Sequence, residues 1–207
     1  MLLELLLFAK AAGAPDFADA GALIPAAIVD IRYAGENNFT GARVDGYKRA
    51  KCLLSRPAAG ALARASAELE GMSLRFRILD CYRPQRAVDH FMRWAGNDDQ
   101  SAKAAYYPNI DKSRLFAEGY IAERSGHSRG STIDLTIDGL DMGSPYDFFD
   151  PLSNTADPRP AADQRANRLL LRLVMEKYGF RPYDLEWWHF TLSDEPYPES
   201  YFDRPVE

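Results

Sequence analysis

The most constraining feature of this sequence is an acidic residue in the middle of an apolar strand. Residues 132–137 read Thr-Ile-Asp-Leu-Thr-Ile, and this run of β-branched and aliphatic residues predicts a strand. Asp134 interrupts the run, and a carboxylate is costly to bury unless it is paired or bound to a cation. The fold must therefore bring partner groups to Asp134.

Helical and strand patterns are mixed along the rest of the chain without strict alternation. We expect further strands at residues 28–33, 74–78 and 189–192, and helices at residues 55–70, 84–95 and 161–178. Four apolar residues of the last helix are expected to face the core: Leu169, Leu170, Leu173 and Val174. The mixture predicts an α+β fold, with helices packed around an antiparallel central sheet.

The length of 207 residues suits one large domain, and we find no internal repeat or long linker. Residues 1–26 are rich in Ala, Gly and Asp and are expected to form a peripheral segment. We assign residues 27–207 to a single domain. With 46% hydrophobic residues, this domain can build a sizeable core.

Charge and the first residues limit the partners of the chain. A formal net charge of −5 argues against binding to duplex nucleic acid, so a small molecule is the expected partner. Residues 1–8 are apolar but too short to cross a membrane as a helix, and Glu4 with no preceding basic residue makes a poor secretory signal. We therefore expect no membrane partner and a cytoplasmic location. A truncated signal, and hence a periplasmic location, is the alternative, and the oligomeric state is left open.

The chain has two cysteines, Cys52 and Cys81. We favour two buried thiols, and the alternative is one disulfide, which requires an oxidising compartment. One cysteine precedes an expected helix and the other ends the strand that follows this helix. We therefore expect the two cysteines to be close in space under either interpretation.

Two of the three histidines lie in segments that suit metal binding. A catalytic zinc ion takes three protein ligands and keeps one open position. His127, Asp134 and His189 would supply two imidazoles and one carboxylate, and the glycines around Arg129 allow His127 to fold back over the strand of Asp134. A lone histidine in a strand is more often a core residue, and His90 has no metal-like partner nearby in the sequence.

Glu186 and Arg83 are the candidate catalytic residues. Glu186 and His189 are three residues apart, so a regular strand would point them to opposite faces. A bend at Trp187–Trp188 would bring both to one site, where Glu186 could act as a general base. Arg83 is either a surface residue that caps a turn or a cleft residue that stabilises an oxyanion.

These residues resemble the LAS metallopeptidases, and more narrowly the VanX-type D-alanyl-D-alanine dipeptidases. Five motifs carry the resemblance, in order, between about residues 27 and 192: Tyr-Ala at 33–34 with Asn-Phe-Thr-Gly at 38–41, Tyr-Arg-Pro at 82–84, Ser-Gly-His-Ser-Arg-Gly at 125–130 with Asp134, Met-Gly at 142–143 with Asp-Phe at 147–148, and Glu-Trp-Trp-His-Phe at 186–190.

The resemblance implies an LAS/hedgehog-like zinc peptidase fold that hydrolyses the dipeptide D-alanyl-D-alanine. One zinc ion would bind His127, Asp134 and His189, with Glu186 as the catalytic base and Arg83 steadying the transition state. Three residues would shape the dipeptide pocket, with the carboxylate of Asp147 meeting the free amino group: Tyr33, Ser125 and Asp147. The resemblance leaves cell-wall turnover, dipeptide recovery and antibiotic resistance open as roles.

Two alternative functions remain at this point. A D,D-carboxypeptidase or endopeptidase would act on longer peptidoglycan peptides and would differ mainly in the loops that close the cleft. A non-enzymatic zinc-binding module would keep the fold without the reaction, and the presence of Glu186 and Arg83 argues against it.

Overall fold

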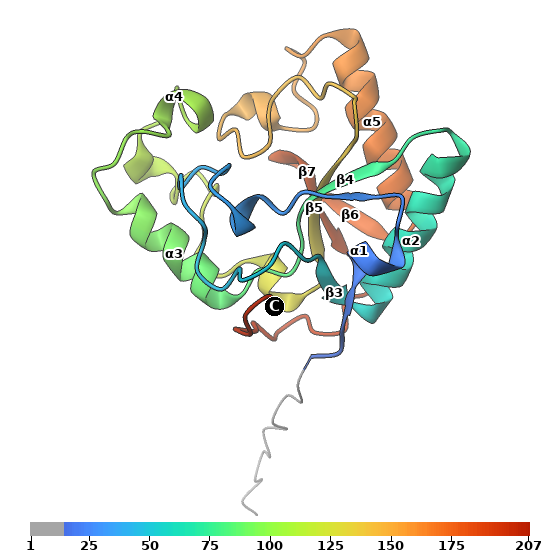
Figure 1. The fold of residues 1–207 in the computed structure, drawn as a ribbon. Helices are drawn as coiled ribbons and strands as arrows, with labels where there is room; N and C mark the ends of the chain where they lie inside the picture. The colour runs from blue at the N-terminus through green and yellow to red at the C-terminus, as the bar shows by residue number, and fades with distance from the viewer. Residues whose placement is uncertain (1–14) are drawn as a thin grey trace, which may run out of the picture.

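The computed structural model describes residues 15–207, and a five-stranded sheet forms its centre (Figure 1). The strand order is β2-β4-β5-β7-β6. Only the short β2 is parallel to its neighbour, and the other pairs are antiparallel. The strand bounds are β2 Ile28–Val29, β4 Phe76–Asp80, β5 Thr132–Ile137, β6 Phe180–Tyr183 and β7 Glu186–Leu192. The expected α+β class with a mainly antiparallel sheet is confirmed.

The longer helices lie on both sides of this sheet. α2 (Arg56–Gly71) and α5 (Ala162–Lys177) contact each other and cover one side, whereas α3 (Gln85–Ala95) and the short α4 (Lys103–Tyr106) lie on the other (Figure 1). Ser55 is the N-cap of α2 as its position suggests, but its hydroxyl lies 2.8 Å from that of Ser131 and makes no capping bond. The expected helices therefore all form, within one or two residues of the expected bounds.

Two strands of the central sheet differ most from the expectation, and β7 begins at Glu186, three residues before its expected start. The strand expected at residues 28–33 ends at Val29, and a 3-10 helix, Arg32–Ala34, then carries Tyr33. β6 was not expected, because Pro182 interrupts its sequence pattern. The strand tolerates this proline because β6 lies at the edge of the sheet, where a missing backbone N–H leaves no neighbour unpaired.

The inward face of α5 is also different from the expected one. Leu169 and Leu173 are 53% and 54% exposed, so their assignment to the core is wrong. Val174 is buried as expected, and Leu170 is partly buried against the core. The helix also buries Leu171 and Met175, and this face places Arg168 inside the protein with an exposure of 1%. The expected and the observed faces of α5 both have helical spacing. The packing of α5 against the sheet buries the face that contains Arg168.

Residues 17–24 pack into the same core as the rest of the chain. β1 (Phe17–Asp19) pairs with β3 (Leu53–Ser55), and the short helix α1 (Ala20–Leu23) follows β1 directly. Ala20 and Ile24 are buried in the main core. These residues belong to the segment expected to be peripheral, and residues 1–14 of that segment lie outside the described part of the chain.

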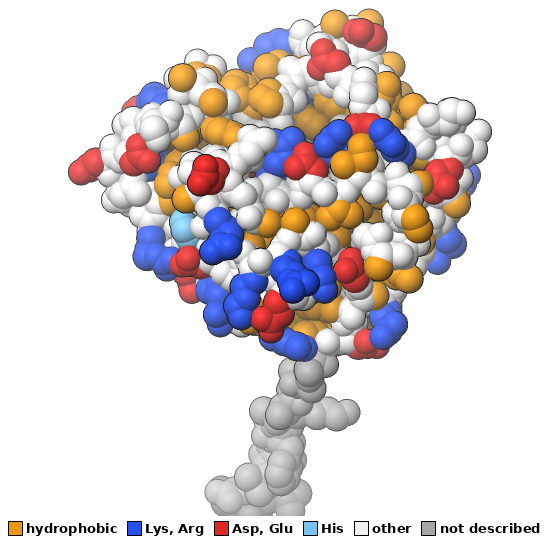
Figure 2. Space-filling model, in the orientation of Figure 1, with side chains coloured by type: hydrophobic (Ala, Val, Ile, Leu, Met, Phe, Trp, Pro, Cys, Tyr) orange, Lys and Arg blue, Asp and Glu red, His pale blue; other side chains and the backbone are white. Residues whose placement is uncertain are grey.

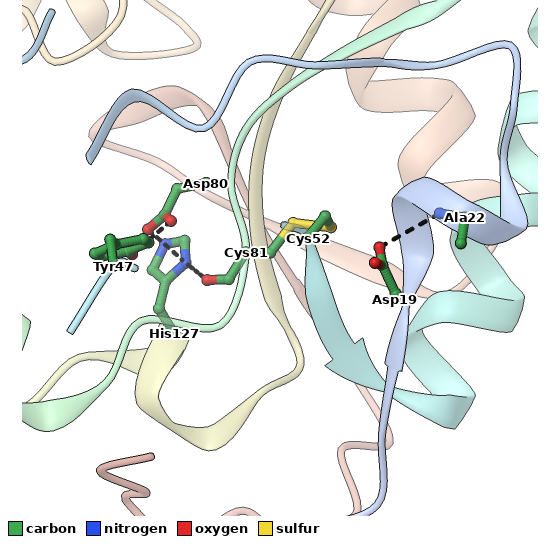
Figure 3. The surroundings of a disulfide bond; sticks show 7 residues. All are labelled: Asp19, Ala22, Tyr47, Cys52, Asp80, Cys81 and His127. Atoms are coloured by element: carbon green, nitrogen blue, oxygen red, sulfur yellow. Dashed lines mark hydrogen bonds and ion pairs between the residues drawn. A yellow bond between two sulfur atoms is a disulfide. The ribbon is translucent and has the colours of Figure 1, made fainter. Parts of the chain in front are cut away.

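Cys52 and Cys81 form a disulfide with a Cα–Cα distance of 5.1 Å (Figure 3). Their expected proximity is confirmed, and the favoured interpretation as two free thiols is wrong. The bond ties the residue before β3 to the residue after β4. It therefore joins the small β1–β3 sheet to the central sheet.

The surface in Figure 2 carries both signs of charge side by side. Exposed ion pairs on the protein include Arg86 with Asp203 and Arg93 with Asp45. Among the described residues, no helix is long and apolar enough to cross a membrane.

The disulfide gives the first prediction. Protein that is denatured without reductant should contain no titratable thiol. The Cys52→Ser/Cys81→Ser variant should lose about 3 kcal/mol of unfolding free energy, because the cross-link restrains the unfolded chain. Urea unfolding of both proteins measures this difference. Two titratable thiols in the unmodified protein would contradict the assignment.

Candidate active site

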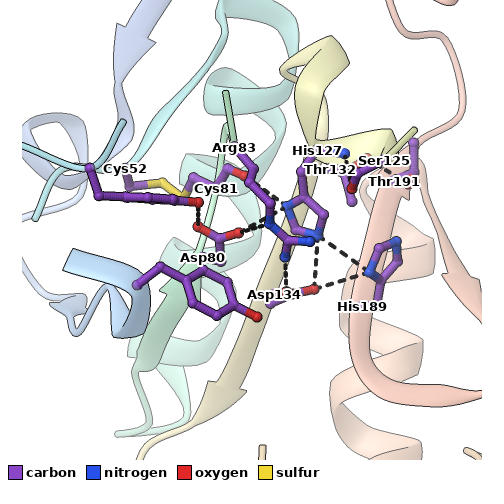
Figure 4. Close-up of polar contacts among 12 residues, drawn as sticks. Cys52, Asp80, Cys81, Arg83, Ser125, His127, Thr132, Asp134, His189 and Thr191 are labelled. Atoms are coloured by element: carbon purple, nitrogen blue, oxygen red, sulfur yellow. Dashed lines mark hydrogen bonds and ion pairs between the residues drawn. A yellow bond between two sulfur atoms is a disulfide. The ribbon is translucent and has the colours of Figure 1, made fainter. Parts of the chain in front are cut away.

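The sheet register brings two predicted ligands together. Asp134 of β5 is paired with His189 of β7, so both side chains leave neighbouring strands at the same level. His127 comes from the 3-10 helix Gly126–Arg129, which ends at Gly130 and leads into β5. Gly130 has a φ of +81°, and a Cβ atom there would lie 2.3 Å from the ring of Phe17. Glycine thus permits the turn that returns His127 to Asp134 (Figure 4).

Three atoms of these residues are spaced as the ligands of one metal ion. His127 Nε2 lies 3.2 Å from Asp134 Oδ1, and His189 Nδ1 lies 3.1 Å from the same oxygen. The two nitrogens are 3.4 Å apart. A tetrahedral zinc ion with bonds of about 2.0–2.1 Å would separate its ligand atoms by about 3.3 Å. Asp134 Oδ1 is also buried and accepts no hydrogen bond from any group within residues 15–207, so the donor set fits zinc.

The other polar atoms of the ligands are held by neighbouring groups. His127 Nδ1 donates to the carbonyl oxygen of Cys81 at 2.7 Å, which leaves the lone pair on Nε2. Asp134 Oδ2 accepts from the Tyr146 hydroxyl at 3.0 Å and from the Arg83 guanidinium at 3.5 Å. These contacts orient His127 and Asp134 before any cation binds.

The electrostatics of the site show how strongly its groups interact. Burial disfavours a charge on His189, but pairing with the carboxylates of Asp134 and Glu186 outweighs this effect and raises the pKa of His189 to about 9. Burial also disfavours the charge on Asp134, yet the two imidazoles hold its pKa well below the usual range. A proton on His189 thus occupies the place that a metal cation would take.

Glu186 reaches the same site because β7 bulges. Pro182 of β6 is paired with Phe190, whereas the next residue, Tyr183, is paired with Glu186. The extra residues of β7 form a bend. Glu186 and His189 are three residues apart, so they can face the same site only with such a bend. Glu186 Oε2 lies 3.3 Å from His189 Nδ1 and is therefore beside the three ligand atoms.

Arg83 points into the cleft and is fixed on several sides. Its Nε donates to Asp80 Oδ2 at 2.9 Å, and its guanidinium lies 4.9 Å from the centre of the Tyr33 ring. Asp80 is fully buried and accepts a 2.6 Å hydrogen bond from Tyr47. The sequence analysis missed Asp80, although it ends an apolar strand and so carries the signal that identified Asp134.

A chain of hydroxyl groups links Asp134 to Asp147. The Tyr146 hydroxyl lies 3.1 Å from that of Tyr33, which donates to both carboxylate oxygens of Asp147 at 3.1 and 3.0 Å. Asp147 is only 4% exposed, and burial raises its pKa well above the usual range. The sequence analysis also missed Tyr146, because an aromatic run in a loop does not specify which ring turns inward.

One cleft of about 340 Å³ brings most of the predicted residues together. Seven of the eight line it, namely Tyr33, Arg83, Ser125, Asp134, Asp147, Glu186 and His189. His127 is buried beneath them, and the Ser125 hydroxyl accepts from the backbone N–H of His127 at 3.3 Å. His90 lies elsewhere, 3.4 Å from Asp45. The volume suits a small ligand.

Comparison with known proteins finds close relatives over most of the chain. Residues 14–207 match the family described as D-ala-D-ala dipeptidase, peptidase M15. A D-alanyl-D-alanine dipeptidase of Streptomyces coelicolor is 42% identical, over 92% of this chain and 98% of the relative. One from Enterococcus faecium is 44% identical, over 86% of this chain and 92% of the relative. A solved LD-carboxypeptidase aligns with 70% of this chain and 61% of its own, at 18% identity and a TM-score of 0.43.

The ligand geometry predicts that the purified protein binds one zinc ion per chain. His189→Ala and His127→Ala should each lose most of this zinc, whereas His90→Ala should keep it, as measured by elemental analysis. Zinc affinity should fall as the pH is lowered, because each imidazole must lose its proton to bind the metal. Full zinc content in His189→Ala would refute this ligand set.

Proposed function

The chain belongs to the D-ala-D-ala dipeptidase family of peptidases, and from this premise we propose that it hydrolyses free D-alanyl-D-alanine with one zinc ion. The observation that carries the proposal is the cluster of His127, Asp134 and His189, with Glu186 beside it. Within this proposal the fold is that of the LAS zinc peptidases.

Zinc held by His127 Nε2, Asp134 Oδ1 and His189 Nδ1 would supply a Lewis acid that polarises the peptide carbonyl and promotes ionisation of water. Glu186 is the general base in this scheme. Its carboxylate takes a proton from the attacking water and passes it to the nitrogen of the departing D-alanine, so the peptide C–N bond breaks as a C–O bond forms. The 3.3 Å distance from Glu186 Oε2 to His189 Nδ1 supports this role.

Arg83 is proposed to stabilise the negative charge that develops on the carbonyl oxygen. Its guanidinium lies in the cleft, and Asp80 and the Tyr33 ring restrict its movement. A donor that is held in place before the reaction needs little reorganisation as the charge appears. Asp80 therefore contributes by orienting Arg83 and not by contacting the substrate.

Groups at the two sides of the ligand cluster suit the two ends of a free dipeptide. Asp147 and Tyr33 would receive the ammonium group, since a buried carboxylate gains a partner there. Ser125 and Arg181 line the cleft near Thr191, which is two strand residues from His189. A guanidinium and a hydroxyl group are suitable hydrogen-bond donors to a carboxylate. We assign the substrate carboxylate to Ser125 and Arg181.

This arrangement favours a dipeptidase over the two alternative functions. A longer peptidoglycan peptide would place a neutral amide, with no charge to pair, against the buried Asp147 carboxylate. A non-enzymatic module would have no use for Glu186 and Arg83 in the same cleft. The substrate is therefore proposed to be a free dipeptide of D-amino acids.

We also propose that the protein works in an oxidising compartment, the alternative to the cytoplasm in the sequence analysis. The Cys52–Cys81 disulfide supports this proposal, because such bonds persist where thiols are not kept reduced.

The assignment of Asp147 predicts a strong preference for the free dipeptide. D-Alanyl-D-alanine should be hydrolysed at least about tenfold more efficiently, by kcat/KM, than its N-acetylated form or a stem peptide ending in D-alanyl-D-alanine. Steady-state kinetics with the three substrates measures this preference. Equal or faster cleavage of the stem peptide would favour the carboxypeptidase alternative.

The role of Glu186 gives a separate prediction. Glu186→Gln should keep one zinc ion and the fold but lose nearly all turnover, because glutamine cannot accept the proton from water. Glu70→Gln on the exposed side of α2 is the matched control and should retain normal turnover. Zinc analysis and kinetics are measured on the same preparations. Near-normal turnover in Glu186→Gln would exclude it as the base.

A further inference from the structure

Arg168 is a buried cation in a position where the sequence pattern predicts an outward polar residue. It lies on α5 with an exposure of 1%, while Leu169 and Leu173 of the same helix are exposed. None of the ion pairs between the described residues 15–207 involves Arg168. A buried charge without a counter-ion is costly, so its retention inside the protein requires compensating contacts.

The donors of Arg168 are all directed at one segment, residues 142–154, which we call the clamp loop. The Nε group donates to the Met142 carbonyl at 2.5 Å, and one terminal nitrogen donates to the carbonyls of Leu152 and Asn154 at 3.0 and 2.9 Å. The other terminal nitrogen donates to Ser144 Oγ at 3.3 Å. Burial lowers the pKa of Arg168 to about 10, so the guanidinium is still charged at neutral pH. One side chain thus holds both ends of this loop.

The clamp loop carries two groups of the active site. The Tyr146 hydroxyl donates to the ligand Asp134, and Asp147 accepts from Tyr33. Asp147 has a φ of +60°, a conformation that residues other than glycine adopt only when the surroundings impose it. The orientation of the Asp147 carboxylate therefore depends on contacts that hold the backbone of the clamp loop in place.

Ser144 extends the contacts of Arg168 to the strand of the catalytic base. Its Oγ also accepts a hydrogen bond from Trp187 Nε1 at 2.9 Å and lies 3.0 Å from Ser153 Oγ. Trp187 follows Glu186 directly in β7. The clamp loop is therefore tied to α5 and to β7 at the same point.

We propose that Arg168 is a positioning residue that sets the specificity for a free amino terminus by holding the clamp loop, and with it Asp147, in place. It does not touch the substrate and acts through Asp147. This inference rests on the proposed function, in which Asp147 receives the ammonium group.

The kinetic test compares Arg168→Met and Arg168→Lys with Arg172→Met, a control at a half-exposed arginine of the same helix that pairs with Glu176. The substrates are D-alanyl-D-alanine and propionyl-D-alanine, which lacks the amino group. The Arg168 variants should keep their zinc and raise KM for D-alanyl-D-alanine by roughly tenfold, because a misaligned Asp147 loses a charge-assisted hydrogen bond. Cleavage of propionyl-D-alanine and the kinetics of Arg172→Met should change less than about twofold.

A double-mutant cycle with Asp147→Asn separates positioning from general destabilisation. If Arg168 acts through Asp147, the Arg168→Met/Asp147→Asn protein should be no worse than Asp147→Asn alone. Equal losses for both substrates, or effects of the two substitutions that add, would overturn the proposal.

Hydrogen exchange tests the clamp independently of any substrate. Backbone amides of residues 142–154 should exchange at least about tenfold faster in Arg168→Lys than in the unmodified protein, and Arg172→Met should not change them. Ser144→Ala, which keeps the buried arginine, should show a smaller increase in the same segment if the Arg168 variants do not fold. Unchanged exchange in these variants would refute the clamp, whereas failure to cleave D-alanyl-D-alanine in the unmodified protein would refute only the proposed function.

Discussion

The carboxylate of Asp134 at the centre of the sheet is the constraint on which the rest of the site depends. A charge at this depth must be matched on both oxygens, because Asp134 is only 2% exposed and water satisfies little of it. Oδ2 contacts Tyr146 and Arg83, and Oδ1 contacts the two imidazole nitrogens. The groups around Asp134 come from widely separated parts of the chain. The active site is therefore an outcome of charge compensation in the core of the protein.

The same requirement recurs at the other buried charges near the cleft. Asp80 is matched by Tyr47 and Arg83, and Arg168 is matched by carbonyl groups of the clamp loop. In each case the partner belongs to a loop or a strand end and not to the same regular element. These charges thus help to give definite positions to segments that lie outside the longer helices and strands. Loops held in this way can present functional groups with little conformational freedom.

The disulfide lies close to the buried charges Asp80 and Asp134. The carbonyl group of Cys81 orients the His127 ring, and Cys81 directly follows Asp80 (Figure 3). The bond to Cys52 fixes the chain at the point where β4 ends and the residues of the active site begin. A covalent link at this position restrains the backbone that holds His127 and Arg83, so the stability of the fold and the geometry of the site depend on the same few residues.

The sequence by itself determined the types of the main elements and most of the residues that meet in the cleft. Local periodicity predicts helices and strands, and Asp134 in an apolar run identifies a buried charge that needs partners. The spacing of three residues between Glu186 and His189 also predicted the bulge in β7, because side-chain direction alternates along a regular strand. Motif order then predicted the family to which the chain belongs.

Only the tertiary structure decided which face of α5 is buried, which further side chains complete the site and how the cysteines pair. Two stripes on α5 have helical spacing, and periodicity alone cannot tell which one packs on the sheet. Asp80 and Tyr146 acquire their roles from neighbours that are distant in the sequence. The cysteine spacing does not distinguish thiols from a bond, because that depends on how the two backbones approach each other. All three were decided by long-range packing, which no local pattern encodes.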